Sequence, residues 1–110
     1  MLIEVNITSS SGEALPPGSL LKVELRDTSM QDVPAIVMKR VHTSVPKEGR
    51  TTALPVTLEV AGVPDGTTVW AHIDVDRDGR ISKGDFMTVE SYPITFAPKQ
   101  SLTLRLKKVT

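Results

Sequence analysis

Several ingredients of common protein functions are missing from this sequence. It contains no cysteine, which excludes a disulfide framework, a thiolate zinc site, an iron–sulfur cluster and a cysteine nucleophile. Aromatic residues make up only 4% of the chain, too few for a platform that stacks nucleic-acid bases. Thirteen basic and 13 acidic side chains cancel to a net charge of zero. Without a clustered basic surface, we expect no nucleic-acid partner.

Long apolar segments and catalytic motifs are also missing. No apolar run approaches the ~20 residues of a transmembrane helix, and the first residues do not resemble a signal peptide. The two histidines, His42 and His72, lack partners at zinc-ligand spacing, and no nucleophile elbow or phosphate-binding loop occurs. We therefore expect a protein that is not an enzyme, built as one monomeric domain over residues 1–110.

The residues that are present favour β-strands. Thirty-one of the 110 residues are Val, Ile or Thr, and eight prolines interrupt the windows in which a helix could form. Alternation of apolar and polar residues predicts seven strands, at 3–7, 21–26, 35–42, 53–60, 67–75, 86–96 (broken at Pro93) and 102–107. Short strands at this spacing predict a single all-β, antiparallel two-sheet sandwich of the immunoglobulin- or transthyretin-like type.

The alternation also predicts which side chains are buried. The inward positions include Val23, Leu25, Val69, Ile73, Val75, Leu104 and Leu106. We expect Phe86 and Phe96 to join the core. Both histidines are predicted to face solvent, with a place at the edge of a metal site as the alternative for His72.

Residues 74–85 contain oxygen donors at the spacing of a twelve-residue calcium loop. Carboxylates stand at loop positions 1, 3, 5 and 12, Gly79 at position 6 allows a sharp turn, and position 7 supplies a carbonyl. The predicted ligands of one structural Ca²⁺ are the side chains of Asp74, Asp76, Asp78 and Asp85 and the carbonyl of Arg80, with Ser82 bound directly or through a water. Because position 12 holds Asp instead of the longer Glu, we expect weak affinity.

An acidic hairpin turn is the alternative for this loop, because aspartates also bond to their own backbone in turns. Repulsion among the carboxylates favours a cation. Strand-like sequences flank the loop on both sides, so it should staple a β-hairpin instead of opening a pair of helices.

Five short motifs carry a family resemblance. In chain order they are Leu15-Pro16-Pro17-Gly18-Ser19, Val23-Glu24-Leu25-Arg26-Asp27-Thr28-Ser29, Asp32-Val33-Pro34-Ala35, Leu54-Pro55-Val56 and Ser91-Tyr92-Pro93-Ile94. From about residue 13 to 106, the sequence resembles the YbaY- and YscW-like lipoprotein family. The resemblance implies a small β-sandwich of the periplasm or cell surface. Members in type III secretion systems act as pilotins, chaperones that help the secretin ring reach the outer membrane.

Together these features predict a non-enzymatic, Ca²⁺-stabilised β-sandwich of the YbaY-like type that binds another protein. A pilotin-like chaperone for secretin assembly is the first alternative, although this chain has no cysteine to carry a lipid. A hydrolase that uses metal-bound water is the second, and it would need an open coordination position beside a pocket.

Overall fold

The computed structural model describes residues 1–29 and 36–110, which form strands, turns and loops but no helix. The strands are β1 (Leu2–Ser9), β2 (Leu20–Asp27), β3 (Ile36–Ser44), β4 (Ala53–Glu59), β5 (Thr67–Asp74), β6 (Phe86–Met87) and β7 (Lys99–Lys108). The all-β prediction is confirmed for this part of the chain. The motif from Asp32 to Ala35, and the predicted start of the third strand, lie outside the described residues. No helix long and apolar enough to cross a membrane occurs among the described residues.

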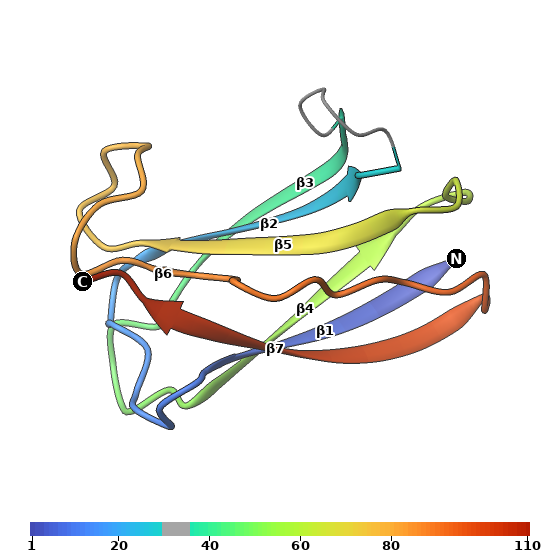
Figure 1. Ribbon diagram of the computed structural model, residues 1–110. Coiled ribbons are helices and arrows are strands. Elements are labelled where there is room, and N and C mark those ends of the chain that lie inside the picture. Colours follow the sequence, from blue (N-terminus) through green and yellow to red (C-terminus); the bar gives the residue numbers. More distant parts are fainter. Residues whose placement is uncertain (30–35) are drawn as a thin grey trace.

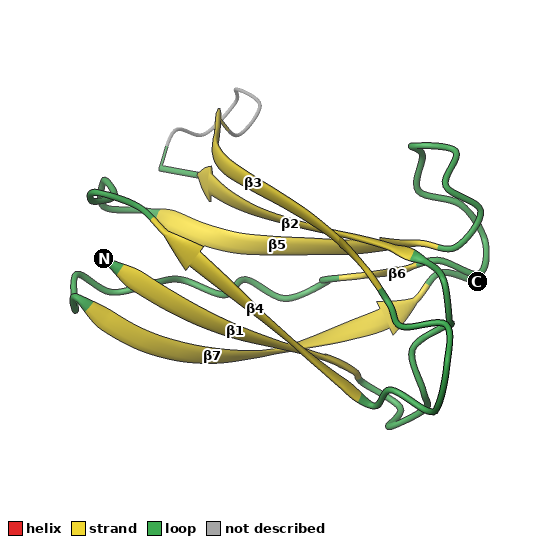
Figure 2. Cartoon of the chain, turned by 180° about the vertical axis from the view of Figure 1, so that it is seen from behind, coloured by secondary structure: helices red, strands yellow, loops and turns green. Residues whose placement is uncertain are grey.

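The strands form one continuous mixed sheet, in the order β3-β2-β5-β6-β7-β1-β4. The sheet curls until its halves face each other, with β3, β2 and β5 on one side, β4, β1 and β7 on the other, and β6 between them (Figures 1 and 2). The predicted sandwich of two separate sheets is therefore wrong, because β6 links the halves into a nearly closed barrel.

The predicted antiparallel pairing also fails at one place. The β1 and β7 strands run parallel, from the pair Leu2 and Lys99 to the pair Ser9 and Leu106. Alternation along a strand shows which side chains are buried, but it carries no information about the direction of the neighbouring strand. The first and last strands of the chain thus meet at the middle of one half of the sheet.

A single core lies between the facing halves. Six of the seven positions predicted to be inward are buried, as is Phe86. The prediction is wrong for Val75, which follows the last residue of β5 and is 42% exposed. The core continues through Ile3, Ile7, Leu21 and Leu58, which come from β1, β2 and β4. Phe96 was expected in the core but is 67% exposed, so that prediction is wrong.

The sixth strand is much shorter than the predicted 86–96. Only Phe86 and Met87 form a regular ladder, and a single bridge joins Pro93 to Thr68. Between them the Thr88 hydroxyl, instead of a carbonyl, accepts a hydrogen bond from the N–H of Ala71. Pro93 has no N–H to donate, which also prevents a continuous ladder. Residues 88–94 therefore run beside β5 with most of their side chains exposed.

Candidate functional site

The acidic loop connects β5 to β6, which pair as an antiparallel hairpin with Ile73 opposite Phe86. This confirms that the loop caps a hairpin and is flanked by strands. Arg77 has a positive φ of 58°. Its guanidinium donates hydrogen bonds to the Gly18 carbonyl (2.9 and 3.1 Å) and the Ser44 hydroxyl (3.1 Å). These bonds anchor the loop to the start of β2 and the end of β3.

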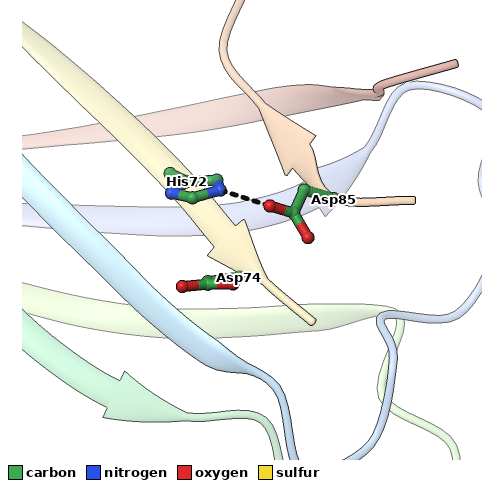
Figure 3. A group of neighbouring side chains, drawn as sticks. All are labelled: His72, Asp74 and Asp85. Atoms are coloured by element: carbon green, nitrogen blue, oxygen red, sulfur yellow. Dashed lines mark hydrogen bonds and ion pairs between the residues drawn. The ribbon is translucent and has the colours of Figure 1, made fainter. Parts of the chain in front are cut away.

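The loop brings its acidic side chains together in two overlapping groups. Within each group, one potential ligand atom per residue lies within 4.8 Å of the others. The first group is Asp74, Asp76 and Asp78, and the second is His72, Asp74 and Asp85. Asp74, at the end of β5, belongs to both groups. Figure 3 shows the second group at the end of the β5–β6 hairpin where the acidic loop connects the two strands.

Asp85 is the centre of a hydrogen-bond network. Its Oδ1 accepts a bond from the Val75 N–H (3.0 Å), while its Oδ2 accepts bonds from the N–H (3.1 Å) and hydroxyl (3.3 Å) of Ser82. Its Oδ2 also lies 2.9 Å from His72 Nε2 (Figure 3). Ser82 and Asp85, both predicted calcium ligands, are thus bonded to each other.

The charge of Asp85 follows from these bonds. Burial raises the pKa of its carboxyl, but the donors Val75, His72 and Ser82 outweigh burial and hold the pKa below its ordinary value. Asp85 is therefore ionised at neutral pH and can only accept hydrogen bonds, so His72 Nε2 is the donor. This hydrogen bond connects His72, near the end of β5, to Asp85 at the base of the loop.

The two histidines have different environments. His42 is exposed, as predicted. His72 is only 1% exposed, so its predicted solvent-facing position is wrong. It lies instead beside Asp74 and Asp85, at the edge of the acidic loop, as in the alternative given for this residue. Strand alternation places His72 on the face away from the core, where its ring lies between Asp85, which it contacts at 2.9 Å, and Trp70, whose ring centroid is 5.8 Å away.

The carboxylates of the first group are crowded. The Asp74 carboxylate raises the pKa of Asp76, because only protonated Asp76 can donate a hydrogen bond to it, and repulsion from the Asp78 charge adds a smaller rise. Asp76 and Asp78 are exposed, whereas Asp74 is buried. The Arg80 N–H donates a bond of 2.8 Å to Asp78 Oδ1, so the backbone at the predicted carbonyl ligand is held close to this group.

A second polar cluster lies on the outer face of β2, β3 and β5. Glu24 of β2 is buried under two arginines, and its carboxylate forms ion pairs with both Arg26 and Arg40. The Arg26 guanidinium carbon also lies 3.9 Å from the centroid of the Trp70 ring, and the Lys22 amine lies 5.5 Å from it. Sequence reasoning missed this cluster. Arg26 follows Glu24 at same-face spacing, but only strand pairing brings Arg40 and Trp70 next to them.

A groove of about 340 Å³ adjoins this cluster, and we call it the Trp70 groove. Its lining comes from the ends of β2 and β5 and from the segment after β6, and consists of Arg26, Thr28, Thr68, Val69, Trp70, Thr88, Val89, Glu90 and Ser91. Val89, which is 61% exposed, presents an apolar surface within it. A second groove, of about 370 Å³, lies over β4, β1 and β7.

The Glu24 ion pairs predict a loss of stability in acid. Burial raises the pKa of Glu24, but hydrogen bonds and charges from Arg26 and Arg40 outweigh burial and hold the pKa below the ordinary value of a glutamate. A lowered pKa stabilises the fold above the unfolded-state pKa, and this contribution disappears as pH falls through the folded-state pKa. Between pH 6 and 3, the free energy of unfolding measured in urea should therefore fall less for Glu24→Gln than for the wild type. The control Glu48→Gln changes an exposed side chain and should show the same pH dependence of the free energy of unfolding as the wild type. The same pH dependence in all three proteins would contradict the role of Glu24.

Comparison with known proteins identifies the family. A family model described as "Type III secretion system lipoprotein chaperone (YscW)" matches residues 2–106. The chain belongs to this family. The resemblance to YscW-like lipoproteins found in the sequence is thereby confirmed, over nearly the whole chain. The family's description names a chaperone, which works by binding another protein.

A solved structure shares the fold. An alternative pilotin from the type II secretion system of Vibrio cholerae is 20% identical to this chain and superposes with a TM-score of 0.73. The match covers 100% of this chain and 97% of that chain. At this identity the likeness establishes the common fold alone. No curated protein matched the sequence significantly.

Proposed function

We propose that this protein is a pilotin-like chaperone that binds a segment of a secretin subunit and accompanies it through the periplasm to the outer membrane. The observation that carries the proposal is the match of residues 2–106 to the family of type III secretion lipoprotein chaperones. The fold shared with a type II secretion pilotin supports it. This function was the first alternative from the sequence and now replaces the general protein-binding module as the leading one.

The Trp70 groove has the chemistry of a protein-binding surface. Tryptophan and arginine are the residues most enriched among those that dominate binding energy at protein interfaces, and here Arg26 stacks on Trp70. Three cations, Lys22, Arg26 and Arg40, outnumber the carboxylates of Glu24 and Glu90 here, so this face carries a net positive charge. We propose that the partner segment places an apolar side chain against Trp70 and Val89 and an acidic one near the arginines.

A hydrolase is a weaker candidate. Metal-bound water would need a substrate pocket beside the metal ligands. The linings of the two grooves described above contain no residue of the acidic loop. A chaperone function, which requires binding without catalysis, fits both the family and the positions of the grooves.

The single tryptophan allows a direct test of partner binding. The whole chain would be titrated with overlapping segments of the secretin encoded in the same genome, while Trp70 emission is recorded. We expect one segment to shift the emission saturably and its scrambled version to have no effect. Val89→Lys should weaken binding about tenfold or more, equivalent to about 1.4 kcal/mol. The matched control, Phe96→Lys, alters a residue of similar exposure outside the groove and should bind like the wild type.

The outcomes test separately whether the protein binds a secretin segment and whether it does so through the Trp70 groove. If no secretin segment binds, by emission or by calorimetry, the chaperone function is overturned. If a segment binds equally well to Val89→Lys and Phe96→Lys, the partner uses another surface and the assignment of the groove is wrong.

A further inference from the structure

The acidic loop takes no part in the proposed chaperone function, yet it contains an unusual buried group. Asp74 is only 3% exposed, at the point where β5 enters the loop. Its Oδ2 accepts a hydrogen bond of 2.8 Å from the Gly79 N–H. Its Oδ1 is buried and has no hydrogen-bond partner among residues 1–29 and 36–110. A buried carboxylate oxygen without a partner is costly, because it has lost water and gained nothing in exchange.

Two further carboxylates lie close to that of Asp74. One potential ligand oxygen from each of Asp74, Asp76 and Asp78 lies within 4.8 Å of the others. Asp76 Oδ1 and Asp78 Oδ1 accept backbone hydrogen bonds from Asp78 (3.4 Å) and Arg80 (2.8 Å). A backbone N–H thus fixes one oxygen of Asp76 and one of Asp78, and the second oxygen of each side chain can bind a ligand. Asp74, whose Oδ1 is unpartnered among the described residues, is the buried member of this set.

The donor atoms indicate which ligand would satisfy Asp74. A hard cation that prefers oxygen is required, since the three side chains are carboxylates. Zinc would favour a site that includes His72, but the Nε2 of that ring already donates to Asp85. Magnesium demands near-ideal octahedral geometry, whereas calcium accepts carboxylates and carbonyls in a flexible shell.

We propose that the β5–β6 loop binds one calcium ion through the carboxylates of Asp74, Asp76 and Asp78. The Arg80 carbonyl, at the seventh position of the loop, is the fourth protein ligand. The ion neutralises the buried Asp74 oxygen and the repulsion among the three carboxylates.

Asp85 and Ser82 have a positioning role in this proposal. Their bonds to each other, and those of Asp85 to His72 and Val75, close the base of the loop on the hairpin. This differs from the spacing-based prediction, in which Asp85 contacts the ion and Ser82 binds it directly or through water. The ligand set is consequently smaller, and we expect a dissociation constant of about 10⁻⁵ to 10⁻³ M.

Calorimetric titration of the chelator-treated chain with CaCl₂, together with thermal melting, tests the site. We expect one ion to bind per chain. Calcium at 100 times its dissociation constant should raise the ratio of folded to unfolded protein about 100-fold, or about 2.7 kcal/mol. For a chain of this size the melting temperature should rise by roughly 10 °C. Magnesium at the same concentration should give a clearly smaller shift.

Two Asp→Asn variants make the test specific. Asp76→Asn changes an exposed side chain, so the protein should stay folded while its calcium affinity falls at least tenfold. Asp65→Asn alters an exposed aspartate in the turn before β5 and should bind like the wild type. The proposal is overturned if 10 mM calcium leaves the melting temperature unchanged, or if Asp76→Asn responds like the wild type. An equal shift with magnesium would overturn the assignment to calcium.

Discussion

Replacing Asp85 by Ala is expected to destabilise the protein by about 3–5 kcal/mol, an effect usual for a broken buried pair. The substitution removes the acceptor for the His72 ring and for the backbone N–H groups of Val75 and Ser82. His72 and Asp85 are both buried, so water cannot freely replace the lost bonds. Urea unfolding followed by Trp70 emission, in the presence of a chelator, measures this loss without any contribution from bound metal.

Asp78→Ala is the matched control, because it removes an exposed carboxylate from the same loop. We expect it to cost less than about 1 kcal/mol, as is usual for exposed side chains. Equal losses for the two variants would show that Asp85 is an ordinary turn residue and does not hold the loop to the hairpin.

A loss of about 2–5 kcal/mol is likewise expected for Leu104→Ala, which deletes a large side chain from the core. Leu104 has no exposed surface, and it lies in β7 opposite Ile7 of the parallel strand β1. The cavity left by the substitution would be in the half of the sheet where the two ends of the chain pair. Equilibrium urea unfolding of the variant and the wild type gives the difference directly.

The adjacent position is the control for this experiment. Thr103 points away from the core and is exposed, so Thr103→Ala should change stability by about 0.5 kcal/mol or less. A register slip of one residue would exchange the two positions. If Thr103→Ala cost more than Leu104→Ala, the described pairing of β7 would be contradicted.

The sequence predicts the strands better than their arrangement. Alternating residues such as Leu102, Leu104 and Leu106 mark a strand and its inward face, because side chains on a strand point alternately to opposite sides. The parallel pairing of β1 with β7 depends on contacts between segments almost a whole chain apart, which no local pattern contains. The short β6 depends on Pro93 and on a hydroxyl of Thr88 that substitutes for a carbonyl, and alternation alone does not show such a substitution.

The acidic loop and the Trp70 groove likewise differ in how much of each could be predicted from the sequence. The acidic loop is a linear motif, so its spacing was visible and its position between two strands was predicted correctly. The role of Asp85 was not visible, since its partner His72 lies 13 residues earlier and meets it only through the hairpin. The Trp70 groove combines three separate segments, and only the folded sheet places Arg26, Trp70 and Val89 together.

The most direct measurement of the proposed function is the amount of secretin multimer in the outer membrane of cells that lack this gene. The account predicts that the multimer falls severalfold, that the wild-type gene and Phe96→Lys restore it, and that Val89→Lys restores it poorly. An unchanged amount of outer-membrane secretin multimer in the deletion strain would contradict the assignment as a pilotin-like chaperone.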